Sequence, residues 1–265
     1  MSIGADIEDV LEELGMTVNV IRPNVATVSE KIEISTPYRV SQPFIREFLS
    51  EGSLRYNTAI QPGDILTGVK TGLSYLVMSI NPEGFEDEVI EYVAFLYKCN
   101  RKGIILQQVD ADDWDQQYRS TMRWEHVYTE VIPFLLYDKQ AFDRAITLQY
   151  TWEQFASTSA ELYFSGWYDV PTLSRLRIFQ QDLGTWQFWN ELTSYAIGET
   201  VLIPDTYQMF ISLTNYNTDN NPIEADEYDP VLHWREIPYI DLKLERVDFN
   251  RFENVNIFSA AADVR

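Results

Sequence analysis

Four aspartates stand close together in the run Asp110-Ala-Asp-Asp-Trp-Asp, and carboxylates at this spacing could hold a calcium ion. A helix–loop–helix calcium loop needs a glycine at its sixth position and a glutamate at its twelfth. Neither is present here, where the twelfth position is Thr121. A second acidic run, residues 224–229, ends in Asp229-Pro230, which is typical of a hydrated turn. We interpret both runs as solvated loops and predict no metal site.

Catalytic groupings are scarce. His126 and His233 are the only histidines, and a lone histidine more often packs or faces solvent than acts as a base. Glu161 and Asp169 could form the carboxylate pair of a glycoside hydrolase, but nothing in the sequence selects them. Phosphate loops, nucleophile elbows, zinc helices and dinucleotide fingerprints are missing from the sequence. We therefore predict no catalytic residue, no cofactor and no enzymatic activity.

The aromatic segment Tyr-Phe-Ser-Gly-Trp-Tyr at residues 163–168 could stack on sugars or bases if it were exposed. In a chain with 14% aromatic residues, packing in a core or an interface is the commoner role of such a segment. We favour packing over binding for these residues.

The charge balance restricts the ligands of this chain. It has 20 Lys and Arg against 41 Asp and Glu, a net charge of −21, which opposes tight binding to nucleic acid phosphates. An acidic wall can still let DNA pass without holding it. Cys99 is the single cysteine, so no intrachain disulfide is expected, and we predict no secretion signal and no membrane span.

The elements that must position any site are mostly strands. Residues 5–14 have the spacing of a short amphipathic helix that ends at Gly15. Short runs rich in β-branched and aromatic residues, separated by Pro and Gly, predict strands; they lie at 17–21, 25–34, 64–66, 75–80, 91–98, 128–137, 144–150, 159–164, 174–179 and 239–247. Residues 41–48 fit a helical turn or a loop, residues 110–125 are interpreted as a loop, and the chain after 247 as a fraying tail.

Residues 54–66, 75–87 and 90–100 carry a Gly-Asp-Ile-Leu strand start, a Tyr-Leu-Val strand and the strand end Leu-Tyr-Lys-Cys-Asn. In this order, over residues 17–103, the chain resembles the head-closure or stopper family of tailed phages, which are small β-barrels. We expect Pro62-Gly63 to turn the chain and Asp64 to cap the turn. Alternation along the strands places four side chains in the barrel interior: Ile65, Leu73, Leu76 and Met78.

A second resemblance covers residues 184–236, which carry one basic and nine acidic residues. The order of Trp189, Tyr195, Gly198, Val201, Tyr207, Pro222 and Trp234 is similar to small chitin-binding-type carbohydrate-binding modules. In that family the opening and closing tryptophans build a small core, so the resemblance implies a lobe core of Trp189, Tyr195, Gly198, Val201 and Trp234. The aromatics that stack on sugar would be Tyr207 and Tyr216. One exposed tryptophan of the family is missing here, and an inert or protein-binding derivative is the favoured reading.

These observations predict a mainly β protein, with a small β-barrel, a short N-terminal helix and a small three-stranded β lobe. The expected domains are a barrel at 1–183, a lobe at 184–236 and a return strand with a tail at 237–265. The stopper resemblance implies a virion protein of the phage neck, made in the host cytoplasm. It would join the head portal side to the tail as a cyclic ring with sixfold or twelvefold symmetry. Its partners would be portal, adaptor and tail proteins.

If the barrel borders a DNA channel, the channel wall should be acidic, and the candidate residues are Glu83, Glu86, Asp87 and Glu88 beside the Asn81-Pro82 turn. The alternative is that these acids only hydrate an outer loop. The alternative function is a carbohydrate-binding adhesin or tail-associated receptor-binding protein, in which the lobe would bind a surface glycan.

Overall fold

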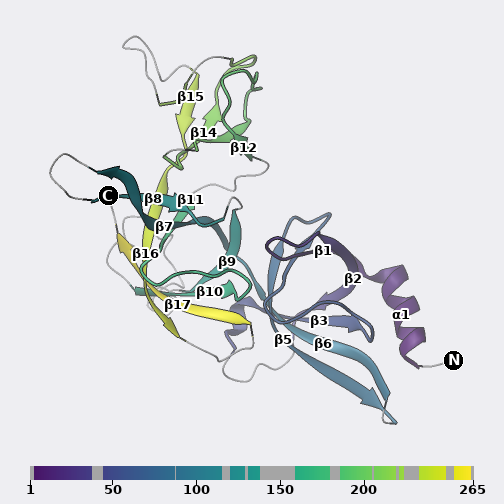
Figure 1. Cartoon of the computed structure of the whole chain (residues 1–265). Helices are drawn as coiled ribbons and strands as arrows, with labels where there is room; N and C mark the ends of the chain where they lie inside the picture. The colour runs from purple at the N-terminus through teal and green to yellow at the C-terminus, as the bar shows by residue number, and fades with distance from the viewer. Residues whose placement is uncertain are drawn as a thin grey trace, which may run out of the picture.

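The computed structural model describes residues 3–37, 44–86, 88–114, 120–128, 131–137, 159–179, 186–204, 206–218, 221–223, 233–248 and 254–263. Across these residues the chain is mainly β, with the helix α1 (Ile3–Leu14) and the short 3-10 turn η1 (Arg46–Phe48). In space, a larger second sheet lies between a closed barrel and a small four-stranded sheet (Figure 1). This confirms the predicted fold class. No described helix has the length and apolar character needed to cross a bilayer.

The first barrel contains six antiparallel strands in the order β1-β2-β3-β6-β5-β4. Their bounds are β1 (Met16–Ile21), β2 (Val28–Ser35), β3 (Leu49–Arg55), β4 (Ile65–Gly68), β5 (Ser74–Phe85) and β6 (Glu88–Lys98). Every second side chain of a strand points inward, and the inward set forms one apolar cluster. It consists of Val18, Val20, Ile32, Leu54, Ile60, Leu66, Tyr75, Val77, Ala94 and Leu96.

The side chains predicted to fill this barrel lie elsewhere. Ile65, Leu76 and Met78 are buried on its outer face, where they pack against the second sheet, and Leu73 is 38% exposed. The prediction was one residue out of phase, because a shift of one residue moves a side chain to the opposite face of a strand. The first five residues of β5 are all buried, so no alternation of apolar and polar residues marks the inner face.

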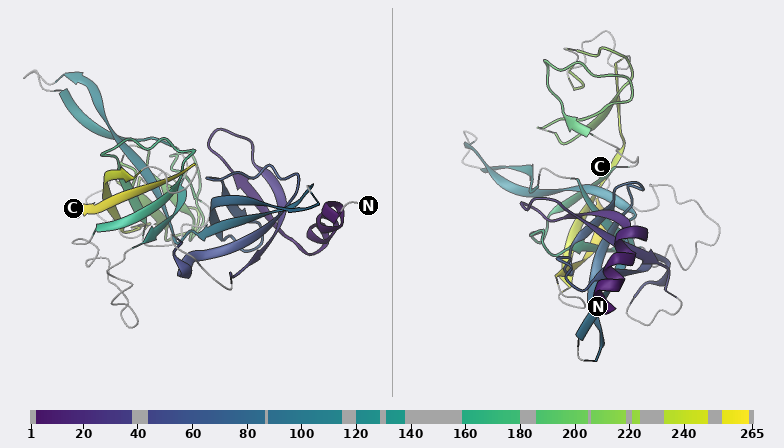
Figure 2. Two further views of the ribbon diagram at one scale, coloured as in Figure 1. Left: turned by 90° about the horizontal axis from the view of Figure 1, so that it is seen from below. Right: turned by 90° about the vertical axis from the view of Figure 1, so that its right-hand side faces the viewer.

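The second sheet also closes on itself. Its strands are β7 (Arg101–Trp114), β8 (Ser120–His126), β9 (Ile132–Tyr137), β10 (Ser159–Ser165), β11 (Arg175–Phe179), β16 (Tyr239–Asp248) and β17 (Val255–Asp263). They pair in the order β11-β16-β17-β10-β9-β7-β8, and β11 pairs with β7 as well. Six strands therefore form a second closed ring, while β8 extends the far part of β7 into a projecting hairpin (Figure 2).

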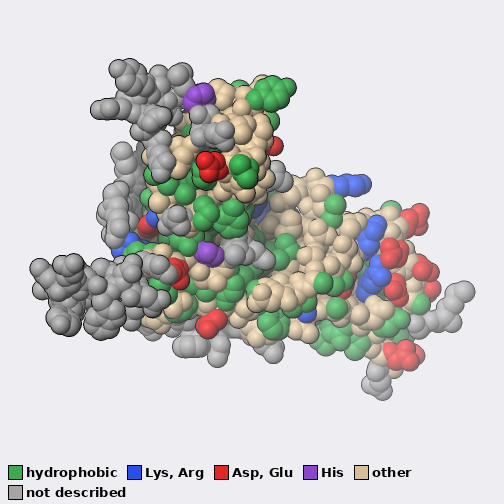
Figure 3. Space-filling view, turned by 45° about the horizontal axis from the view of Figure 1, so that its top comes forward, with side chains coloured by type: hydrophobic (Ala, Val, Ile, Leu, Met, Phe, Trp, Pro, Cys, Tyr) green, Lys and Arg blue, Asp and Glu red, His purple; other side chains and the backbone are tan. Residues whose placement is uncertain are grey.

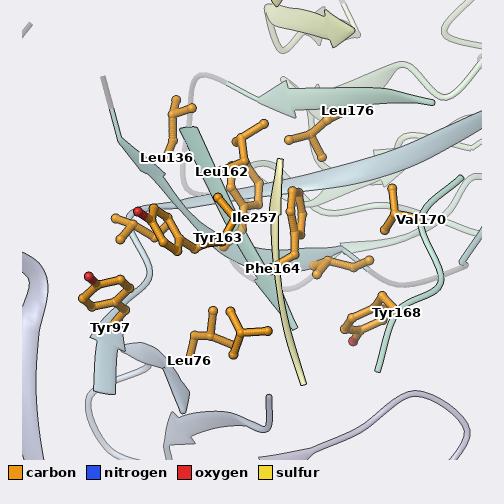
Figure 4. Close-up of a cluster of buried hydrophobic side chains, with 14 of the residues drawn as sticks. Leu76, Tyr97, Leu136, Leu162, Tyr163, Phe164, Tyr168, Val170, Leu176 and Ile257 are labelled. Carbon is orange, nitrogen blue, oxygen red and sulfur yellow. The ribbon is translucent and has the colours of Figure 1, made fainter. Parts of the chain in front are cut away.

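One apolar core is continuous through the second ring and the outer wall of the first barrel. Phe134 and Phe164 stack inside it with ring centroids 4.9 Å apart. Tyr97 of β6 meets Tyr163 of β10 edge to face at 5.2 Å (Figure 4). The two barrels therefore share one set of buried apolar contacts. The segment 163–168 supplies three of these buried side chains, Tyr163, Phe164 and Tyr168, as its assignment to packing requires.

The small sheet lies in the chain between β11 and β16, and we call it the lobe. Its strands are β12 (Trp186–Phe188), β13 (Thr200–Leu202), β14 (Met209–Ser212) and β15 (Trp234–Glu236), with β12 parallel to β13 and the others antiparallel. The parallel β12 is a fourth strand beside the predicted three. The lobe and the β5–β6 hairpin project from opposite ends of the molecule (Figure 2).

Helix α1 covers one end of the first barrel and is fixed there by charge. Arg55 of β3 pairs with Glu8, at 3.3 Å, and with Glu12. Leu11, on the side of the helix that faces the barrel, is 3% exposed. The amide of Gly15 donates a hydrogen bond to the carbonyl of Leu11 and so closes the last turn of the helix. These contacts agree with the predicted helix and its glycine stop.

The predicted domains were one barrel over residues 1–183 and a return strand with a tail over residues 237–265. In the structure the first barrel closes within residues 16–98, and β7 to β11 belong to the second ring. That ring is completed by β16 and by β17, which lies in the predicted tail. The lobe is thus an insertion into the second ring.

Candidate functional site

The lobe has a core of its own, built from the residues that carry its sequence pattern. Tyr195, Val201 and Trp234 are buried at 1%, 0% and 6% exposure, and Trp189 packs against them. The Tyr195 and Trp234 rings meet at 5.4 Å. Gly198 has φ +87°, a backbone conformation that residues with a side chain rarely adopt, which explains why a glycine stands in this turn. The spacing in the sequence thus corresponds to one physical cluster.

The two predicted sugar-stacking residues do not form a pair. Tyr207 is 8% exposed, and its hydroxyl and the Nδ1 atom of His126 form a 2.7 Å hydrogen bond. Tyr216 is 89% exposed. They precede and follow β14, so they lie at opposite ends of one strand. The assignment of Tyr207 as a stacking residue is corrected: its ring belongs to the contact between the lobe and the second ring, which includes Leu106 and Met209.

A buried arginine, held by an ion pair within the second ring, connects that ring to the lobe. Arg177 of β11 donates to both carboxylate oxygens of Asp241, at 2.8 and 3.0 Å. Its Nη1 atom donates to the carbonyls of Thr206 and Tyr207, at 2.8 and 3.0 Å. Its guanidinium carbon lies 3.8 Å from the centroid of the Tyr239 ring. Every arm of the guanidinium is engaged, so the turn between β13 and β14 is held in one position.

The predicted channel acids lie on the β5–β6 hairpin, beyond the body of the first barrel. Glu83, Glu86 and Glu88 are exposed, and Asp87 lies outside the described residues. Acidic side chains also gather on α1, at the same end of the molecule (Figure 3). At the base of the hairpin, burial raises the pKa of Glu91, with smaller contributions from Glu83 and Glu33. This end is therefore a concentrated negative surface.

Asp64 joins the two barrels. Its carboxylate is fully buried and accepts hydrogen bonds from Arg22, at 2.5 and 2.6 Å, and from the amide of Gln61, at 2.8 Å. The bond to Gln61 is the turn cap expected from the sequence, and Gly63 makes the turn with φ +91°. A fourth bond comes from Trp167 of the second ring, and no sequence pattern could predict it, because 103 residues separate the two.

The other groups considered for chemistry take part in structural contacts. The Nδ1 atom of His233 lies 3.4 Å from the Thr214 hydroxyl. Burial raises the pKa of the Cys99 thiol to about 12, so this thiol is not activated as a nucleophile. Glu161 accepts a 3.1 Å hydrogen bond from Tyr163. In the part of the chain that the structure describes, no three potential ligands gather around a metal position.

Neither acidic run of the sequence is fully described by the structure. Residues 224–229 lie outside the described residues, and the same holds for the side chains of the run 110–115. Comparison with known proteins identifies no relative: no protein-family model, no curated protein and no solved structure matches this chain.

Proposed function

We propose that this chain is a structural virion protein of a tailed phage and forms part of the neck ring between head and tail. The observation that carries the proposal is the first barrel. The segment that resembles the stopper family, residues 17–103, is the segment that closes as six antiparallel strands. In the Pro62-Gly63-Asp64 turn at the start of the Gly-Asp-Ile-Leu motif, Gly63 and Asp64 are buried at the junction with the second ring.

The mechanics of the chain support an assembly role. The two closed rings leave few free strand edges among the described strands, so copies would associate through side chains of the body rather than by edge pairing. The two closed rings share one continuous core, and a packed body of this kind suits a subunit that must hold its neighbours in register in a cyclic assembly. The net charge of −21 suits a conduit that DNA passes without sticking.

Cryo-electron microscopy of the parent particle tests this proposal directly. We expect a closed ring of this chain at the head–tail junction, with sixfold or twelvefold symmetry and with portal or adaptor and tail proteins on its two faces. Density for the chain only at a fibre tip would contradict the neck assignment and favour the adhesin.

A carbohydrate-binding role is the second candidate, and one residue favours it. Tyr216 is 89% exposed with φ +59°, a strained conformation that holds an aromatic ring in solvent. One stacked ring contributes about 1 kcal/mol, so binding of chitin fragments should be millimolar at best for each copy. Titration of the whole chain, with Tyr216→Ala as the control, decides the point: saturable micromolar binding that the substitution abolishes would favour the adhesin.

A further inference from the structure

The β5–β6 hairpin extends past the strands that flank it. Strand β3 pairs with β6 only between residues 91 and 97, and β4 pairs with β5 only between 74 and 76. Residues 81–86, 88 and 89 are all exposed. The outer part of the hairpin thus pairs only with itself, and an isolated two-stranded hairpin is marginally stable in water. It gains stability if another surface covers it.

The tip presents apolar side chains among acids. Phe85 is 52% exposed and Val89 is 42% exposed, one on each strand beside the turn. Phe85 pairs with Glu88 and Val89 pairs with Gly84, so the two apolar side chains lie on opposite faces of the hairpin. Glu83 and Glu88 share the face of Phe85, and Glu86 has φ +49° in the turn. An exposed apolar centre with a charged rim is the usual composition of an interface core and its border.

The hairpin is not built for strand addition. Pro82 lies in β5 opposite Tyr92 and has no amide hydrogen to offer to an incoming strand. A proline together with charged residues is how exposed strand edges are protected from pairing. Contact with a partner must therefore run through the side chains of the tip.

The charge of the segment identifies the chemistry of the partner. Between residues 71 and 97 the sequence has five acidic residues and no basic one. Such a surface repels nucleic acid phosphates and anionic lipid. A second copy offers the tip few cationic side chains, because the chain carries 41 acidic and 20 basic residues, so contacts between copies in a ring would use other surfaces. Complementarity requires a cationic surface on a different protein.

We propose that the tip of the β5–β6 hairpin docks in an apolar pocket with a rim of Lys and Arg on a different protein. Phe85 enters the pocket, and Glu83, Glu86 and Glu88 pair with the rim. This inference rests on the proposed function in one respect: the partner is a neighbour of the chain in the same particle.

Site-specific photo-crosslinking tests the docking. A benzophenone amino acid replaces Phe85 in the full chain, produced in cells that assemble the particle, and the attached peptide is identified by mass spectrometry. A matched control carries the same group at Val69, which is 55% exposed in the turn between β4 and β5. We expect the probe at position 85 to attach to one different protein, at a peptide with Lys and Arg, and the control to give no such adduct.

Charge reversal tests the rim. The triple variant Glu83→Lys, Glu86→Lys and Glu88→Lys should lower the yield of the adduct about tenfold. Reversal of the basic residues in the attached peptide should then restore it. The triple variant should fold, since Glu83 lies opposite Glu91 and a lysine there faces an opposite charge; the circular dichroism spectrum checks this.

A second triple variant provides the matched control, with the same change in net charge on exposed positions of α1: Asp6→Lys, Asp9→Lys and Glu13→Lys. It should leave the adduct unchanged. Attachment to another copy of this chain, no adduct at position 85, or an adduct insensitive to the hairpin reversal would each overturn the inference. An antibody against the chain, applied to purified particles, tests the proposed function separately. Absence of the antibody label from the neck would reject that function, and the crosslink in cells would still decide the docking.

Discussion

The indole Nε1 of Trp167 donates a 2.9 Å hydrogen bond to Oδ1 of Asp64. The same carboxylate binds Arg22, whose guanidinium carbon lies 5.4 Å from the centroid of the Trp167 ring. One buried charge thus satisfies groups from both closed rings. The junction between the two closed rings thus contains directional hydrogen bonds as well as apolar contacts. The hydrogen bonds restrict the orientation of the rings, and the apolar contacts hold them together.

Asp64→Ala should destabilise the chain by about 3 kcal/mol, because it leaves the Arg22 charge and the Trp167 donor without their acceptor. This is the low end for a buried pair, since the Arg22 side chain keeps 22% of its surface in solvent. Trp167→Phe, which keeps a ring but loses the donor, should cost about 1 kcal/mol. Urea unfolding measures both, and equal costs would contradict the central place of the carboxylate.

Arg177→Met should cost about 3–5 kcal/mol, because it leaves the buried Asp241 carboxylate without its partner. The double variant Arg177→Met with Asp241→Leu should recover most of this loss, since a buried ion pair replaced by apolar residues is often neutral. The carbonyls of Thr206 and Tyr207 would still lack their donor. Hydrogen exchange should therefore show faster exchange at 206–212 in the double variant, with the barrels unchanged; full protection there would argue against Arg177 as the lobe's anchor.

The sequence predicted the mainly β class and the first barrel, since β1, β2, β4, β5 and β6 carry β-branched runs between turns. It missed β3, β7, β8 and β17. The strand β17, Val255–Asp263, includes three consecutive alanines, and it forms because β10 and β16 pair with both of its edges. Strand propensity is weak against such tertiary pairing, and pairing between distant segments leaves no local pattern.

The candidate sites divide in the same way. The lobe core was predictable because Trp189, Tyr195, Val201 and Trp234 lie within one short segment. The burial of Tyr207 was not, because its partner His126 lies 81 residues away on another sheet. The exposed acids of the hairpin were named from the sequence, but their projection beyond the barrel depends on where β3 and β4 end.

Glu91→Gln should stabilise the chain at neutral pH. In the folded state burial raises the pKa of Glu91 above its usual value of 4.5, and the carboxylates of Glu83 and Glu33 raise it further. A raised pKa means that the protonated form favours folding, so this contribution is present below pH 4.5 and is lost as the pH rises through the folded-state value. Removing a like-charged cross-strand pair should therefore gain about 0.5 kcal/mol at pH 7 and nothing at pH 3.5.

Thermal unfolding at the two pH values measures the difference. Glu88→Gln is the matched control, since this exposed residue lies at the tip and should change stability at neither pH. A gain from Glu91→Gln that persists at pH 3.5 would show that the charge is not its cause.

Trp234→Ala should unfold the lobe and spare the two closed rings. The side chain is 6% exposed and packs edge to face on Tyr195, so its loss should cost about 3–5 kcal/mol. A unit this small has little other core, and its stability should not exceed that cost. Tyr216→Ala is the matched aromatic control: its ring is 89% exposed, and the change should stay within about 0.5 kcal/mol. Hydrogen exchange should show residues 186–218 losing protection in the Trp234 variant alone, while β9 and β10 keep theirs. Loss of protection in all three sheets together would mean that the lobe has no independent core and that the second ring depends on it for stability.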